Sequence, residues 1–335
     1  MPGQIKTSNT SDLVIRGNSI YTIVDGPSWT EAETNANKLG GHLITINDKE
    51  ENNWIASEFS KEKYFYEYQV GSDLDKPQFW IGATDKDVEG EWEWSSGEDY
   101  LFDGWLRTHE VMPLPGNGHS AQDYAIGIFN GQSNYPSGGL IHGDGPGTYY
   151  WADYKNSYAN FNAKGIAETP FIRRGKSAYV IVEGPTWEEA EANANKLGGH
   201  LVTINDAEEL NFLIDNFSSL VQSDTFDFAN DSYQESSPSK RVWTGLKISN
   251  GWYEDEDGLP RGTKTWSSGE ISEYSPKSYF SGGVQVNTGA TSDNLIQLLL
   301  ADYSSTLKYS SGWEFDLNNN AGTWISFQHS DDERY

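Results

Sequence analysis

The sequence YTIVDGPSWTEAETNANKLGGHLITIND, at residues 21–48, returns as YVIVEGPTWEEAEANANKLGGHLVTIND at residues 179–206. With a constant offset of 158, the two stretches are identical at 22 of 28 positions. This period is much longer than the repeat unit of a solenoid, so it indicates two tandem copies of a whole domain. We therefore expect a flexible lead-in over residues 1–12, a first domain over residues 13–172 and a second over residues 173–335.

Each copy predicts a strand, a helix, a second strand and a second helix, in that order. The first strand is expected at residues 21–24 and again at residues 179–182. Ser28 stands three residues before Glu31, as Thr186 does before Glu189, and this is the spacing of a helix capping box. A Gly-Gly pair then ends the first helix, and His-Leu-Ile/Val-Thr-Ile predicts a short buried strand. An Asp-x-x-Glu cap opens the second helix.

The remainder of each copy predicts strands separated by long loops. In the first copy we expect strands at residues 79–82, 92–94, 123–128, 149–153 and 165–172. Helices early in each copy and strands later predict an α+β fold, with two helices and a small antiparallel sheet in each domain.

Composition excludes several classes of protein. The chain has 335 residues, no cysteine and a formal charge of −27. The missing cysteines remove disulfides, thiolate nucleophiles and thiolate metal sites. Strong negative charge argues against binding to nucleic acid or to an anionic membrane. We expect no membrane insertion, because the sequence lacks a run of about 18 apolar residues.

The repeated elements carry spaced motifs in a fixed order: W-x-E-A-E-x-x-A-x-x-L-G-G-H-L-V/I-T-I, W-I-G or W-T-G, W-x-W-S-S-G and W-x-D. Together they resemble the C-type lectin-like domain, twice, over nearly the whole chain. The cysteines of the animal members are absent, and in this the chain is similar to the cysteine-free bacterial branch found in large surface and secreted proteins. The resemblance implies a non-enzymatic binding module, extracellular or on the cell surface, that recognises carbohydrate or protein ligands and serves in adhesion.

The resemblance also implies a structural calcium ion in the first copy. Asp85 and Glu89 match the ligand pair of the family's T-D-x-x-x-E-G motif, and Asp123 matches the carboxylate that completes the site. Carboxylate oxygens from loops are the ligands that a hard cation such as Ca²⁺ requires. The alternative interpretation of the same residues is a solvated acidic hairpin.

The sugar-binding site of the family is only partly kept. The family uses Glu-Pro-Asn or Gln-Pro-Asp, then an acid, then Trp-Asn-Asp. Here the loop offers Leu-Pro-Gly-Asn117, Gln122 stands where the acid belongs, and Trp-Ala-Asp153 keeps one ligand of two. Direct coordination of sugar by calcium is therefore impaired, and we expect Asn117, Gln122 and Asp153 to hydrogen-bond a ligand. Aromatic residues near the loops are further candidates for stacking on sugar rings: Trp105, Tyr135, Tyr149 and Trp252.

The second copy departs further from the calcium pattern. Its hairpin at residues 250–258 is longer, and Arg261 stands where Glu89 would align. Asp293 aligns with Asp123. For the W-x-D step the candidates are residues 313–316 and Trp324, and the sequence leaves both open. If one copy keeps a site, we expect it to be the first.

The second copy also has no counterpart of the strand at residues 165–172 within this sequence. One explanation is that the sequence is cut from a longer array, and the other is that a neighbouring molecule donates a strand, head to tail. A structural repeat module that polymerises in this way and binds no small ligand is the alternative function. A catalytic constellation is not recognisable in the sequence.

Overall fold

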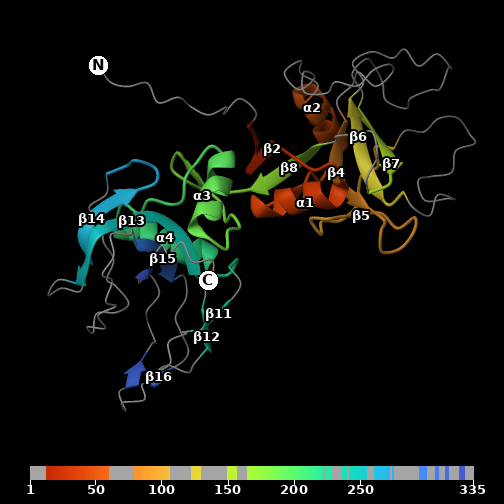
Figure 1. Cartoon of the computed structure of the whole chain (residues 1–335). Helices are drawn as coiled ribbons and strands as arrows, with labels where there is room; N and C mark the ends of the chain where they lie inside the picture. Colours follow the sequence, from red (N-terminus) through yellow and green to blue (C-terminus); the bar gives the residue numbers. More distant parts are fainter. Residues whose placement is uncertain are drawn as a thin grey trace, which may run out of the picture. The chain divides into compact units, whose positions relative to one another are not determined.

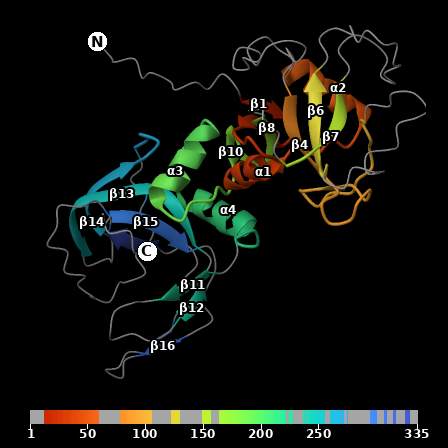
Figure 2. The same ribbon diagram turned by 45° about the vertical axis from the view of Figure 1, so that its right-hand side comes forward.

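The computed structural model describes residues 13–59, 78–105, 122–129, 149–156, 164–221, 224–227, 236–239, 241–254, 260–271, 274, 294–299, 306–308, 314–316 and 324–328. The chain divides into two compact units, Met1–Val182 and Glu183–Tyr335, which we call unit 1 and unit 2. Figure 1 shows both units with most of their elements labelled, and Figure 2 shows them after a turn of 45°.

Unit 1 combines two helices with one large sheet. The helices are α1 (Trp29–Lys38) and α2 (Lys49–Phe59). The strands of the sheet are β1 (Val14–Arg16), β2 (Ser19–Val24), β3 (His42–Leu43), β4 (Gln78–Thr84), β5 (Glu93–Trp94), β6 (Tyr124–Phe129), β7 (Tyr149–Tyr154) and β8 (Lys164–Pro170). They pair in the order β1-β2-β8-β4-β6-β7, with β3 on β8 and β5 on β4. The β4–β8 pair is parallel, whereas the neighbouring β2–β8 and β4–β6 pairs are antiparallel.

The start of α1 follows from its capping residue. Ser28 has an extended backbone, and its Oγ accepts the N–H of Glu31 at 3.3 Å, which satisfies one of the free donors of the first turn. Trp29 is buried on the inner face of the helix, and its Nε1 donates to the carbonyl oxygen of Ile81 in β4 at 2.7 Å. Gly40 ends the segment with φ at 80°, a left-handed conformation that suits glycine. The cap and the turn therefore fix α1 against the sheet.

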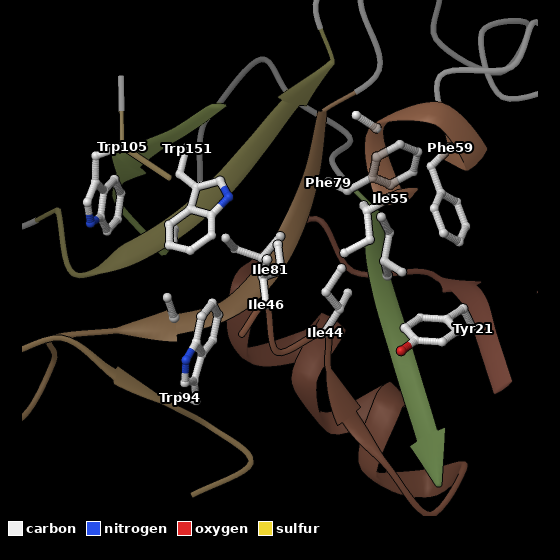
Figure 3. Packing of buried hydrophobic residues seen from close by; sticks show 14 residues of the cluster. Tyr21, Ile44, Ile46, Ile55, Phe59, Phe79, Ile81, Trp94, Trp105 and Trp151 are labelled. Carbon is white, nitrogen blue, oxygen red and sulfur yellow. The ribbon is translucent and has the colours of Figure 1, made fainter. Parts of the chain in front are cut away.

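The core of unit 1 lies between the helices and the sheet (Figure 3). Figure 3 shows Trp94, Trp105 and Trp151 at one end of the cluster, and Tyr21 and Phe59 at the other. Fully burying one such side chain contributes about 1.5–3 kcal/mol to stability. The aromatic residues of this cluster are thus structural.

Unit 2 has two helices and a smaller main sheet in its described part. The helices are α3 (Trp187–Lys196) and α4 (Ala207–Phe217). The strands are β11 (Asp224–Asp227), β12 (Ser236–Ser239), β13 (Arg241–Glu254), β14 (Pro260–Trp266), β15 (Asn294–Leu299), β16 (Thr306–Lys308), β17 (Glu314–Asp316) and β18 (Trp324–Gln328). The main sheet has the order β14-β13-β15-β18, and β11-β12 and β16-β17 are separate pairs. The α+β class predicted from the sequence is confirmed.

The two units repeat the same internal contacts at counterpart residues. The Nε1 of Trp187 in α3 donates to the carbonyl oxygen of Thr244 in β13 at 2.8 Å, as Trp29 does to Ile81. Further repeated contacts join Gly82 N to Ile44 O and Gly245 N to Val202 O, both at 3.0 Å, and Thr45 to Ser96 and Thr203 to Ser268, at 2.7 and 2.6 Å. The pairing of β18 with β15 matches that of β7 with β6, so Trp324 opens the strand that corresponds to β7.

Some predicted strands differ in extent from the observed ones. The strand expected over residues 42–46 is limited to β3, and the W-x-W strand is limited to β5. The strand expected at residues 21–24 is part of β2. The counterpart strand was expected at residues 179–182. Of these residues only Tyr179 is in a strand, at the end of the short hairpin of β9 (Ile172–Arg174) and β10 (Ser177–Tyr179). Residues 180–182 are not in a strand, which corrects the prediction. The reason is that β2 is paired along its whole length with β8, whereas among the described strands none pairs with residues 180–182.

Candidate functional site

The first predicted site residue, Asp85, directly follows β4 and lies beside the start of β6. Thr84 is the register partner of Tyr124. One step further along, the N–H of Asp85 donates to the carbonyl oxygen of Asp123 at 3.2 Å, and the hydroxyl of Thr84 donates to the same oxygen at 2.7 Å. The ends of β4 and β6 therefore bring Asp85 and Asp123 together, although the two are far apart in the sequence.

The side chain of Asp85 is buried, with 3% of the residue exposed. Its Oδ2 accepts the N–H of Gly90 at 2.9 Å, which closes the turn that follows β4. Its Oδ1 is also buried and has no hydrogen-bond partner among the described residues. Burial raises the pKa of this carboxyl, and the negative charges of Glu89 and Asp123 raise it further, against the opposing effect of the Gly90 N–H. A buried carboxylate oxygen that has no hydrogen-bond partner and lies near other negative charges is stabilised when a cation or a proton binds to it.

Glu89 lies in the exposed turn between β4 and β5, near enough for its charge to act on Asp85. In the same turn Lys86 forms an ion pair with Asp87 and a longer one with Glu93, at 3.7 Å. Within the described ranges, no three acidic or histidine side chains are grouped closely enough to hold a metal ion. The structure thus joins Asp85 to Asp123 and leaves Glu89 at the edge of the turn.

The predicted ligand-binding residues lie at the same end of the sheet, as far as they are described. Gln122 and Asp123 come directly before β6, and both are half-buried. Asp153 in β7 is the register partner of Ala125, so it lies diagonally across the β6–β7 pair from Asp123. Asn117 lies outside the described residues. Asp85 directly after β4, Asp123 directly before β6 and Asp153 near the end of β7 therefore lie at one end of the sheet, on three neighbouring strands or next to them.

Aromatic side chains form the base of this end of the sheet. The ring of Trp105 packs against Trp92 and Trp151, with centroids 4.3 and 5.6 Å apart, and its Nε1 donates to the hydroxyl of Tyr100 at 2.9 Å. Trp105 is 9% exposed, so the expectation that it stacks on a ligand is wrong. Its ring is used in the core instead. Tyr135 and the side chains of Tyr149 and Trp252 lie outside the described residues.

In unit 2 the corresponding hairpin is formed by β13 and β14, in which Tyr253 is the register partner of Arg261. The described part of this hairpin stops at Glu254 and resumes at Pro260, so the acidic run between them, like Asp293, lies outside it. The acidic site is therefore described for unit 1 alone.

Sequence reasoning assigned no role to Thr84 and Gly90, although both lie inside the quoted motif. The Thr84 hydroxyl holds the carbonyl of Asp123, and Gly90, with φ at 82°, turns its N–H toward Asp85. The left-handed backbone favoured by glycine is the sequence signal that marks this turn.

Comparison with known proteins finds a family match within unit 1. Residues 25–123, from the loop before α1 to the start of β6, match the model of the C-type lectin domain. This segment of the chain is therefore similar to a C-type lectin domain.

Among its relatives is a perlucin-like protein of Mytilus galloprovincialis, 29% identical over 92 residues, which are 27% of this chain and 52% of that protein. Another is the galactose-specific lectin nattectin of Thalassophryne nattereri, 27% identical over 114 residues, which are 34% of this chain and 65% of that lectin. A mouse scavenger receptor C-type lectin carbohydrate-recognition domain is 20% identical, with a TM-score of 0.32 over 50% of this chain and 99% of that domain. The chain thus spans about half to two thirds of the length of these two sequence relatives.

Proposed function

We propose that unit 1 is a non-enzymatic binding domain of an extracellular or cell-surface protein, and that it recognises carbohydrate or protein ligands with the help of calcium. The observation that carries this proposal is the buried, unpaired Oδ1 of Asp85 beside Asp123. The relationship to a galactose-specific lectin supports a binding module over a purely structural repeat.

The side chains that would hold the calcium are Asp85, Glu89 and Asp123. Asp85 meets the chemical requirement, because its free oxygen and the nearby negative charges are the features that a hard cation neutralises. Calcium would supply positive charge that lets these carboxylates lie together, and it would thereby fix the turn between β4 and β5. Glu89 is exposed in this turn.

Ligand binding is proposed at the neighbouring residues Gln122 and Asp153, together with Asn117. Gln122 carries both donors and acceptors, and Asp153 contributes acceptors, so together they suit the hydroxyl groups of a sugar. We also propose that unit 2 is a second lectin-like domain of the cysteine-free type known from bacterial surface proteins, since it repeats the internal contacts of unit 1.

Thermal unfolding in calcium and in chelator tests the metal part of the proposal. A site filled at about 100 times its dissociation constant stabilises by about 2.7 kcal/mol, so the melting temperature of unit 1 should rise in calcium. Asp85→Ala and Glu89→Ala should remove the rise. A parent protein that melts identically in both solutions contradicts the calcium site.

Retention on a glycan array, with calcium and with chelator, tests the ligand part separately. Gln122→Ala and Asp153→Ala should lose retention while they keep the calcium-dependent melting shift. If no glycan retains the parent protein, the carbohydrate assignment is contradicted. The ligand proposed for the same residues is then a protein.

A further inference from the structure

Strand β8 closes unit 1 by entering the middle of its sheet. It pairs with β2 along one edge and with β4 and β3, at successive positions, along the other. Figure 3 shows β8 as the green arrow that runs between Ile44 and Tyr21. The carbonyl oxygen of Ile166 in β8 accepts the N–H of Ile44 at 2.8 Å, and both Ile166 and Ala167 are fully buried. Strand β8 therefore seals the core of unit 1.

Close contacts around β8 require two glycines. A Cβ on Gly41 would lie 2.0 Å from the carbonyl oxygen of Glu168 in β8. A Cβ on Gly165, in β8 itself, would lie 2.4 Å from Cδ2 of Leu43 and 3.0 Å from Cβ of Ala32. Such approaches are shorter than van der Waals contact, so larger residues at these positions are incompatible with the strand.

Unit 2 keeps the residues that face β8 in unit 1. Gly41, Leu43 and Ala32 correspond to Gly199, Leu201 and Ala190, with the same residue type at each position. Ile44 corresponds to Val202, another β-branched residue that exposes the same backbone N–H. We call Ala190, Gly199, Leu201 and Val202 the acceptor surface. Its composition is that of a surface built to be covered by a strand.

Within the part of unit 2 that the structure describes, no strand covers this surface. A Cβ on Gly199 would meet only one described atom within 4 Å, the carbonyl oxygen of Ala194 at 3.8 Å. Gly41 is buried, whereas Gly199 is exposed. Leu43 is 0% exposed and Leu201 is 8% exposed, and Ile44 is 0% exposed while Val202 is half-buried. The same side chains are thus more open in unit 2.

We infer that the acceptor surface of unit 2 binds an extended strand with the sequence character of β8, and that this strand belongs to a different polypeptide and not to a second copy of this chain. Unit 1 shows what such an occupant needs: a glycine that fits against Leu201 and Ala190, followed by isoleucine and alanine that enter the core. The Val202 N–H is placed to donate to the strand, as Ile44 donates to Ile166. Backbone hydrogen bonds give affinity in this kind of recognition, and side chains on alternate residues give specificity.

The test uses a synthetic peptide with the sequence of residues 164–172, KGIAETPFI, labelled with a fluorophore and added to the full chain. We expect saturable binding by fluorescence anisotropy. In the chain, Gly199→Val should weaken binding about tenfold or more, because the added side chain occupies the place of the incoming backbone. In the peptide, valine in place of the glycine that corresponds to Gly165 should weaken binding to a similar degree.

The Gly199→Val chain remains a fair comparison, because the described atoms around Gly199 leave room for a side chain. Its circular dichroism and melting should match those of the parent. Absence of peptide binding to the parent chain overturns the inference. Binding that Gly199→Val leaves unchanged also overturns it, since the peptide would then be replacing β8 in unit 1. A concentration-dependent dimer of the parent chain that is lost in Gly199→Val would identify a second copy as the donor, and this would overturn the assignment of the strand to a different polypeptide.

Discussion

The backbone N–H of Asp85 donates to the carbonyl oxygen of Asp123 at 3.2 Å, while one carboxylate oxygen of Asp85 is buried without a hydrogen-bond partner among the described residues. The first contact is an ordinary link between neighbouring strands. The second is unfavourable, since a buried charged oxygen without a partner costs free energy. The end of β4 therefore carries a local instability that a bound cation would relieve.

Asp85→Asn should have opposite effects in chelator and in calcium. In chelator, the neutral amide removes the repulsion by Glu89 and Asp123, and its oxygen still accepts the Gly90 N–H, so unit 1 should gain about 1 kcal/mol. In calcium, the variant should be less stable than the parent, because a ligand oxygen is lost. Chemical denaturation followed by tryptophan fluorescence measures both differences.

The matched control for this experiment is Asp87→Asn, in the same turn. Asp87 is exposed and pairs with Lys86, so this variant should leave the calcium response unchanged. An equal effect of both substitutions would mean that general surface charge, and not the position of Asp85, determines the result.

The stability of unit 1 should fall as pH rises through the titration of His42. The Nδ1 of His42 lies 2.7 Å from a carboxylate oxygen of Glu33, and this hydrogen bond raises the pKa of the imidazole above its ordinary value, against the opposing effect of burial. The folded state then binds the proton more tightly than the unfolded state, so the gain is complete below the ordinary histidine pKa of 6.5 and is lost above the raised one. An NMR titration of His42 measures the pKa, and His42→Gln should flatten the pH dependence of melting in this range. A His42 that titrates at or below the ordinary value contradicts the prediction.

Local features of the fold were predictable from the sequence. Ser28 caps α1 and Asp48 caps α2 through hydrogen bonds to residues three positions ahead, Glu31 and Glu51, and such spacing is visible in the sequence itself. Strand pairing was less predictable, because it depends on distant segments. Residues 180–182 have the composition of a strand, yet the state of a short strand is determined by its partner in the sheet.

The candidate site shows the same division. The motif around Asp85 predicted its place after a strand, and in the structure the register of β4 and β6 brings it next to Asp123. The burial of one oxygen without a partner was not readable, because it depends on how the turn to Gly90 closes. Trp105 was expected to be exposed in a loop, but the structure packs its ring between Trp92 and Trp151. Aromatic residues are equally suited to both settings, and only packing distinguishes them.

Tyr21→Phe should destabilise unit 1 by about 1–3 kcal/mol, because it removes a hydrogen bond to a carboxylate in a buried setting. The hydroxyl of Tyr21, a residue only 2% exposed, donates to Oε1 of Glu168 at 2.7 Å. The counterpart substitution Tyr179→Phe is the control, and its effect should be smaller, because Tyr179 is half-buried. Urea denaturation measures both. Equal losses of stability for the two substitutions would show that the hydrogen bond from Tyr21 to Glu168 does not contribute the predicted stabilisation.

Gly41→Val and Gly199→Val should differ sharply, although the two glycines occupy the same position in the repeated sequence. At Gly41 the new Cβ meets the carbonyl oxygen of Glu168 at 2.0 Å, and because that atom belongs to the backbone of β8, the strand itself must shift. We expect unit 1 to lose about 3 kcal/mol or more. At Gly199 the nearest described atom is 3.8 Å away, so the melting of the chain alone should change little. Melting of both variants by differential scanning calorimetry decides the matter. If Gly199→Val destabilises the chain as strongly as Gly41→Val, then a segment of the same chain already covers Gly199, and the acceptor surface is closed.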